Sequence, residues 1–146
     1  MKMGARIVFA VAALFLGTGF ALAAESEQAA QKPYTVEDGK VDKKTFNGWR
    51  RYTESCLRCH GPDGAGSSYG PDLVESVKHM TQDQFNEIVV NGRTNVSAAT
   101  TSVMPPFGEV EDEVEDVVTY LDDIWAYLKA RADGVLGRGR PLRIGD

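Results

Sequence analysis

Apolar side chains recur at helical spacing in three stretches of the chain, and the last stretch is the longest. Its apolar positions follow one another in steps of three and four residues: Val110, Val114, Val117, Leu121, Ile124 and Leu128. This spacing predicts one face of an amphipathic helix, which Gly134 can end. No stretch alternates between apolar and polar residues, so we expect no strands and an all-α fold.

Two shorter helices are predicted earlier in the chain. The first follows its cap, Asp42, and runs to about Ser55. Its apolar face is formed by residues spaced three apart, Phe46, Trp49 and Tyr52. The second helix begins at Thr81, which forms a capping-box pattern with Gln84, and it stops at Gly92.

The first 23 residues have the layout of a secretory signal peptide. Lys2 and Arg6 form a short basic start, and residues 7–16 are apolar. Ala21 and Ala23 then provide the small residues that a signal peptidase reads. Because the apolar run is short for a membrane span, we expect cleavage after Ala23 and delivery to the periplasm, without a membrane anchor.

The remaining chain is expected to form one domain with short extensions. Residues 24–39 form a predicted flexible lead, residues 40–134 the domain, and residues 135–146 a basic tail. Within the domain, residues 61–72 are rich in Gly, Pro, Ser and Asp, and residues 93–106 are rich in Ser, Thr and Ala. We expect both segments to be loops.

Charge limits the possible partners. The chain of 146 residues has 16 Lys and Arg against 21 Asp and Glu, a formal net charge of −5, which argues against a nucleic-acid-binding protein. Residues 109–123 contain eight acids and no base. Acids near a helix N-terminus complement the helix dipole, and an acidic cluster is also suited to docking a basic partner. Both interpretations stay open.

The strongest chemical signal is Cys56-Leu57-Arg58-Cys59-His60, the C-x-x-C-H pattern of covalent c-type haem attachment. Two thiols three residues apart can reach the two vinyl groups on one haem edge, and the adjacent His60 then becomes an axial iron ligand. A thioredoxin-like pair would follow a predicted strand. A zinc site would need further ligands, and the chain has only two Cys and two His. The sequence therefore predicts one covalent haem.

The sixth iron ligand has three candidates, Met104, Met80 and His79, and an open iron site is the remaining possibility. Met104 lies in a predicted loop and precedes Pro105 and Pro106, whose fixed φ angles restrict that loop. Met80 and His79 lie just before a predicted helix cap, where a Met is often core filler. We therefore expect Met104 to bind the iron. A thioether ligand raises the potential and blocks oxygen, which suits an electron carrier more than an enzyme.

These residues and their order resemble the class I cytochromes c. The matching segments are residues 48–56, 70–73, 104–107 and 124–129. The resemblance implies a fold in which N- and C-terminal helices cross beside one haem. It also implies that the carbonyl group of Pro71 accepts a hydrogen bond from His60 and orients it. No catalytic residue is implied, because such proteins transfer electrons.

A narrower resemblance concerns residues 38–42, 47–49, 61–69 and 130–141. These segments are similar to small periplasmic cytochromes that accept electrons from quinoprotein (PQQ-dependent) methanol and ethanol dehydrogenases. The resemblance implies such a dehydrogenase as electron donor and another cytochrome or a terminal oxidase as acceptor. The alternatives are a general shuttle that serves other dehydrogenases or a peroxidase, and a haem sensor or enzyme with an open iron site.

Overall fold

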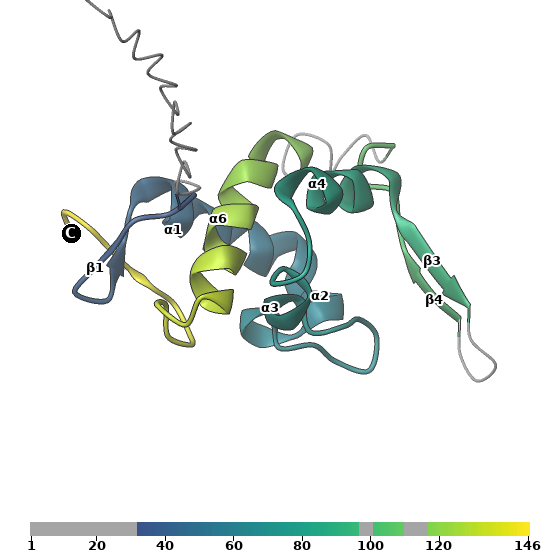
Figure 1. Cartoon of the computed structure of the whole chain (residues 1–146), viewed down its shortest axis with the longest axis horizontal. Helices are drawn as coiled ribbons and strands as arrows, with labels where there is room; N and C mark the ends of the chain where they lie inside the picture. Colours follow the sequence, from purple (N-terminus) through teal and green to yellow (C-terminus); the bar gives the residue numbers. More distant parts are fainter. Residues whose placement is uncertain (1–31, 97–100, 110–116) are drawn as a thin grey trace, which may run out of the picture.

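The computed structural model describes residues 32–96, 101–109 and 117–146. The predicted signal peptide, residues 24–31 of the predicted lead and the start of the predicted last helix at Val110 lie outside the described residues. Within them, helices supply most of the core and short strands lie at the periphery, as expected for the all-α class (Figure 1). No helix in this part of the chain is both long and apolar enough to cross a membrane.

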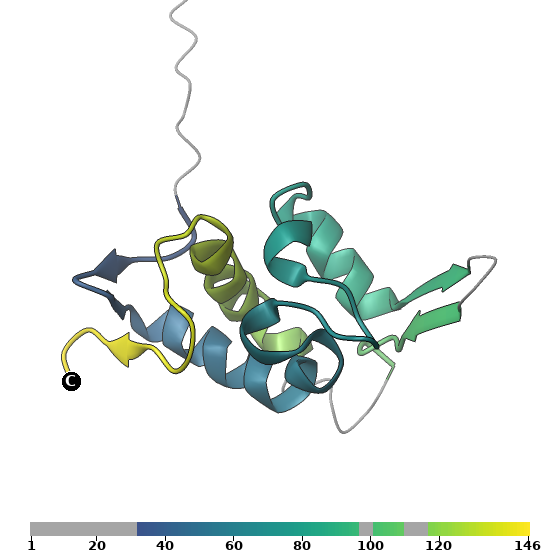
Figure 2. The same ribbon diagram turned by 90° about the horizontal axis from the view of Figure 1, so that it is seen from below.

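Two helices cross at the centre of the molecule, α1 (Lys43–Arg51) and α6 (Leu121–Ala132) (Figures 1 and 2). Gly48 lies at the crossing, and a Cβ atom added there would overlap the backbone carbonyl group of Asp123. Beside it, the amide of Asn47 donates to the carboxylate of Asp123 at 2.7 Å. The helices approach this closely because position 48 carries no side chain.

Helix α1 begins as predicted, because the side chain of Asp42 accepts a hydrogen bond from the Thr45 N–H at 2.9 Å. The helical path does not stop near Ser55. It continues through a π-helical turn, Tyr52–Cys56, directly into the short helix α2, Leu57–His60. A π-helical turn takes up one extra residue and so rotates the side chains that follow it. The predicted attachment segment is therefore largely helical.

Helices α3 (Leu73–Ser76) and α4 (Gln82–Asn91) follow. The predicted capping box is confirmed: the Thr81 hydroxyl accepts from the Gln84 N–H at 3.2 Å, and the Gln84 side chain accepts from the Thr81 N–H at 2.9 Å. Gly92, with φ of 72°, ends α4 as predicted.

The expectation that no strands form is wrong. Strand β1 (Val36–Glu37) pairs antiparallel with β2 (Lys40–Val41), and β5 (Leu142–Arg143) pairs in parallel with β2. A hairpin of β3 (Arg93–Val96) and β4 (Thr101–Met104) occupies most of the second predicted loop. Strands β1, β2 and β5 have two residues each and are too short to show a period. In the hairpin all strand residues except Met104 are exposed, so no buried face requires apolar and polar residues to alternate. The two sheets lie at opposite ends of the molecule (Figure 2).

The last helix begins later than the apolar pattern predicts. Among the described residues, a 3-10 turn (Val118–Tyr120) precedes α6, and its last residue, Tyr120, with φ of −112° and ψ of 23°, is the N-cap of α6. The pattern still marks burial correctly, because its described members are all buried: Val117, Leu121, Ile124 and Leu128. The apolar period therefore located the buried face, although it did not detect the break in the helix.

The C-terminal tail is fastened to the loop after α2 by one carboxylate. Asp63 accepts a hydrogen bond from the Gly139 N–H at 2.9 Å and forms an ion pair with Arg138 at 3.1 Å. Partial burial alone would raise the pKa of Asp63, but these bonds outweigh it and hold the pKa below its usual value. The tail, whose Leu136 is buried, is thus held against the helices.

Candidate functional site

A cavity of about 280 Å³ lies among α2, α3, α4, α6 and the β3–β4 hairpin. Much of its wall is apolar, formed by Leu73, Val77, Phe85, Ile88, Ile124 and Leu128. Voids in a packed protein core rarely exceed a water molecule, so a cavity of this size is a binding site and not a packing defect.

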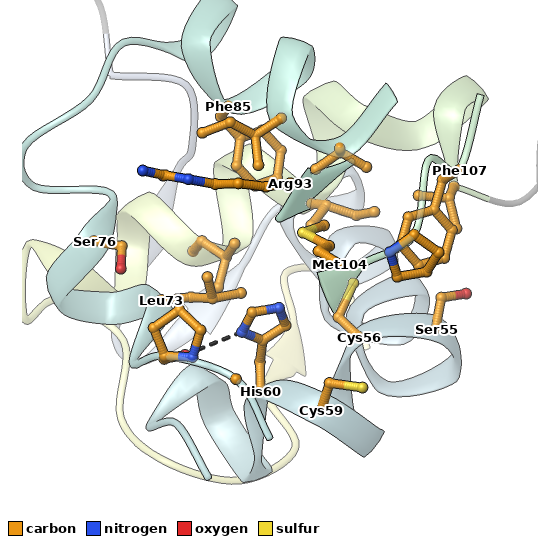
Figure 3. Close-up of a pocket in the computed structure, with 18 of the residues that line it drawn as sticks. Ser55, Cys56, Cys59, His60, Leu73, Ser76, Phe85, Arg93, Met104 and Phe107 are labelled. Atoms are coloured by element: carbon orange, nitrogen blue, oxygen red, sulfur yellow. Dashed lines mark hydrogen bonds between the residues drawn. The ribbon is translucent and has the colours of Figure 1, made fainter. Parts of the chain in front are cut away.

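All three chemical groups of the C-x-x-C-H segment line this cavity (Figure 3). Neither Cys56 nor Cys59 is in a disulfide, and His60 is 7% exposed. The hydroxyl group of Tyr52 donates to the carbonyl group of Gly61 at 2.5 Å and so fixes the residue after His60. Burial raises the pKa of Tyr52 above its usual value, which keeps this donor protonated.

The imidazole of His60 is oriented by the backbone of the following loop. Its Nδ1 atom lies 3.0 Å from the carbonyl oxygen of Pro71. A carbonyl oxygen only accepts hydrogen bonds, so Nδ1 carries the proton and the Nε2 lone pair is left for a ligand. Gly70 makes room for this contact, because a Cβ atom there would lie 2.9 Å from Nδ1. The contact between His60 and the Pro71 carbonyl group, which the family resemblance implies, is therefore present in the structure.

Met104 reaches the cavity from the end of β4. The chain around it is clamped to the end of α4: the Phe107 N–H donates to the carbonyl group of Val89 at 3.1 Å. At Gly92, a Cβ atom would lie 2.6 Å from the carbonyl oxygen of Met104 and 2.8 Å from the nitrogen of Pro106. The positive φ and the close approach both require glycine at this position.

The other two candidates for the sixth iron ligand, His79 and Met80, differ in their position relative to the cavity. The His79 side chain is 75% exposed, contacts Glu75 at 3.2 Å and is not part of the cavity wall. Met80 does line the cavity, as Met104 does. The structure thus removes His79 from the site and leaves two methionines beside it.

Two features of the site were missed by sequence reasoning. Arg93, which is exposed, and Tyr69, which is 77% exposed, both line the cavity from segments predicted to be loops. Arg93 stands in no hydrophobic period or recognised motif, and Tyr69 belongs to the resembling segment 61–69, which assigned it no role at the site. The other charged lining residues are Arg58 and Glu54, and Glu54 is paired with Arg51 at 3.2 Å.

The donor set fits haem c and fits few other groups. The cavity offers two thiols, one imidazole with a free Nε2 lone pair, methionine thioethers and apolar walls. Within the described ranges, no group of three or more His, Cys, Asp or Glu side chains could hold a bare metal ion. An imidazole and a thioether are the axial ligands typical of cytochromes c.

Comparisons with known proteins agree with this chemistry. Residues 44–121 match the family model described as "Cytochrome C oxidase, cbb3-type, subunit III". Cytochrome c-553I of Paracoccus denitrificans is 48% identical over 111 residues, which cover 76% of this chain and 47% of the relative. The chain thus spans about half the length of that relative. Cytochrome c-555 of Methylococcus capsulatus is 37% identical, over 68% of this chain and 72% of the relative.

A solved structure shows the same fold. The crystal structure of the c-type cytochrome XoxG from Methylobacterium extorquens AM1 matches with a TM-score of 0.67 and 40% sequence identity. The match covers 77% of this chain and 67% of XoxG. The predicted fold is thereby confirmed. The chain belongs to the class I c-type cytochromes, a family whose members carry covalently attached haem c.

Proposed function

We propose that this protein is a periplasmic one-haem electron carrier. In this proposal Cys56 and Cys59 form the thioether bonds, His60 and Met104 are the axial iron ligands, and the Pro71 carbonyl group orients His60. The observation that carries the proposal is the contact between His60 and Pro71 at 3.0 Å, in a cavity that the side chains of Cys56 and Cys59 also line. The bound haem supplies one-electron redox chemistry.

The surrounding residues have supporting roles. The apolar wall excludes water from the cavity, which favours a higher potential. The strand–proline junction after Met104 limits its retreat from the site. Glu54, the one carboxylate among the described residues that line the cavity, is paired with Arg51, and the His60 imidazole contacts the Pro71 carbonyl group instead. These residues therefore serve electron transfer and need no acid–base step.

For the partners, we propose a quinoprotein methanol or ethanol dehydrogenase as donor and another cytochrome or a terminal oxidase as acceptor. The similarity of residues 38–42, 47–49, 61–69 and 130–141 to cytochromes that serve such dehydrogenases supports the donor. The first 23 residues, with their signal-peptide layout, support delivery to the periplasm.

The ligand assignment is tested with carbon monoxide on the reduced, periplasm-matured protein. The wild type should resist carbon monoxide because the iron is six-coordinate. Met104→Ala should bind it readily, whereas Met80→Ala, the matched methionine in the same cavity wall, should behave like the wild type. Rapid and complete binding by the wild type would contradict the electron-carrier ligation.

The donor assignment needs a separate measurement. Oxidised protein is mixed with reduced quinoprotein dehydrogenases, and its reduction is followed by stopped flow. A cognate donor should reduce it rapidly, and the rate should fall with ionic strength because charged surfaces steer the encounter. Uniformly slow, salt-insensitive reduction by all of them would reject the proposed donor class.

A further inference from the structure

Arg93 is a cationic residue on the wall of the cavity. It is the first residue of β3, and in the described part of the chain its side chain forms no ion pair or hydrogen bond. Figure 3 places its guanidinium group on the side of the cavity away from the sulfur atoms of Cys56 and Cys59. Arg58, the other cationic lining residue, belongs to the segment between those two cysteines.

The two propionate groups of a bound haem would need a charged or hydrogen-bonding partner. A haem has two propionate carboxylates, on the two pyrroles opposite those that bear its vinyl groups. If Cys56 and Cys59 hold the vinyl-derived carbons, as in the proposed function on which this step rests, the carboxylates point away from the sulfur atoms. A carboxylate beside apolar walls is costly unless a charged or hydrogen-bonding partner meets it.

We propose that the guanidinium group of Arg93 binds a haem propionate. Asn95 and Ser102 line the cavity from the same face of the hairpin and are paired in register, so both are placed to donate further hydrogen bonds. Arg93 is also the register partner of Met104. Its contact with the propionate holds the base of the hairpin against the haem and keeps Met104 in place. Arg93 is thus a positioning residue.

This role has three measurable consequences. A positive charge near the haem favours the reduced form, so Arg93→Gln should lower the midpoint potential. Loss of the cation raises the pKa of the propionate, so the potential of the variant should depend on pH between about pH 5 and 7 more steeply than that of the wild type. A loosened hairpin should release Met104 more readily, so imidazole should bind the ferric protein roughly three- to fivefold more tightly.

The experiment uses periplasm-matured holoprotein and needs no partner. Mass spectrometry first confirms one attached haem, which tests the proposed function separately. Spectroelectrochemical titration across pH and imidazole titration are then run on Arg93→Gln, Arg93→Lys and Arg58→Gln. Arg93→Lys keeps the charge and should restore the midpoint potential and its pH profile. It should restore the low affinity for imidazole only in part, because a lysine lacks the planar guanidinium group.

Arg58→Gln is the matched control, because it removes the same charge from the other side of the cavity wall. It should change neither the pH dependence nor the affinity for imidazole. If Arg93→Gln carries one haem but matches Arg58→Gln in both measurements, Arg93 binds no propionate and the inference is wrong. Failure of Arg93→Lys to restore the pH profile would also overturn it.

Discussion

The crossing of α1 and α6 and the β3–β4 hairpin lie on different sides of the cavity and hold their positions by different means. At the crossing, backbone meets backbone at Gly48, and the Asn47–Asp123 hydrogen bond joins the two helices. The hairpin is exposed along nearly its whole length and approaches the rest of the protein mainly at its base. The first region is stabilised by the chain itself, whereas the second depends on what the cavity binds.

The largest effect is expected where the two helices touch. Gly48→Ala should lower the free energy of unfolding by about 3 kcal/mol or more, because the new Cβ would overlap the carbonyl group of Asp123. Urea unfolding of the holoprotein measures it. Gly137→Ala is the control: nothing lies within 4 Å of a Cβ there, so a change within about 0.5 kcal/mol is expected. Equal losses would show that the crossing is not the rigid part.

A smaller effect is expected beside the attachment segment, where Tyr52 contacts the residue after His60. Tyr52→Phe removes the hydrogen bond to the Gly61 carbonyl group and should cost about 1–2 kcal/mol. Its ring partner Tyr127 is the natural comparison, since their centroids lie 5.5 Å apart and the Tyr127 hydroxyl has no partner among the described residues. Tyr127→Phe should therefore be close to neutral in the same assay. A reversed order would contradict the assigned role of Tyr52.

The contacts of Asp63 with the C-terminal tail should contribute about 1 kcal/mol to the free energy of unfolding, and this contribution depends on pH. The pKa of Asp63 is lowered in the folded state, so its contribution is present above the unfolded-state pKa of about 4 and is lost as pH falls through the folded-state value. Asp63→Asn should therefore be less stable than the wild type at pH 7, and the difference should shrink below about pH 4. Unfolding across pH tests this, with exposed Glu37→Gln as control. A pH-independent difference would contradict it.

The smallest effect is expected on the hairpin. Val103 is 67% exposed, and Val103→Thr should change the unfolding free energy by less than about 0.5 kcal/mol. The same substitution at Val117, which is fully buried, should cost about 1–3 kcal/mol because a hydroxyl group enters the core. Similar losses at the two positions would mean that the hairpin is as important to folding as the core.

The same contrast explains which structural features the sequence could predict. Local chemistry was readable: the Asp42 and Thr81 caps are present, and apolar periodicity identified the buried face of α6. The strands were not readable, because the β3–β4 hairpin has no buried face, β1 and β2 are only two residues each, and β5 pairs with β2 about a hundred residues away. Likewise, α6 begins only after a 3-10 turn that ends at Tyr120, and no Gly or Pro signals that boundary.

The candidate site divides in the same way. The attachment segment is contiguous, so a motif identified Cys56, Cys59 and His60, and the structure places all three on one cavity. Pro71 came from family resemblance, and its contact with His60 is present. Arg93 lines the cavity from the hairpin, where strand pairing sets it opposite Met104, and an exposed hairpin has no apolar period that would indicate this pairing.

The close fit of Asn47 and Gly48 against Asp123 also determines the order in which the protein can assemble. The hydrogen bond joins residues 76 positions apart. Under the proposed export to the periplasm, a chain that crosses the membrane N-terminus first would present Cys56–His60 well before α6 is available to cover α1. The attachment segment therefore spends a period without its tertiary packing, when both thiols are open to modifying machinery. A mutation that slowed export of the C-terminal third would lengthen that period without altering the finished molecule.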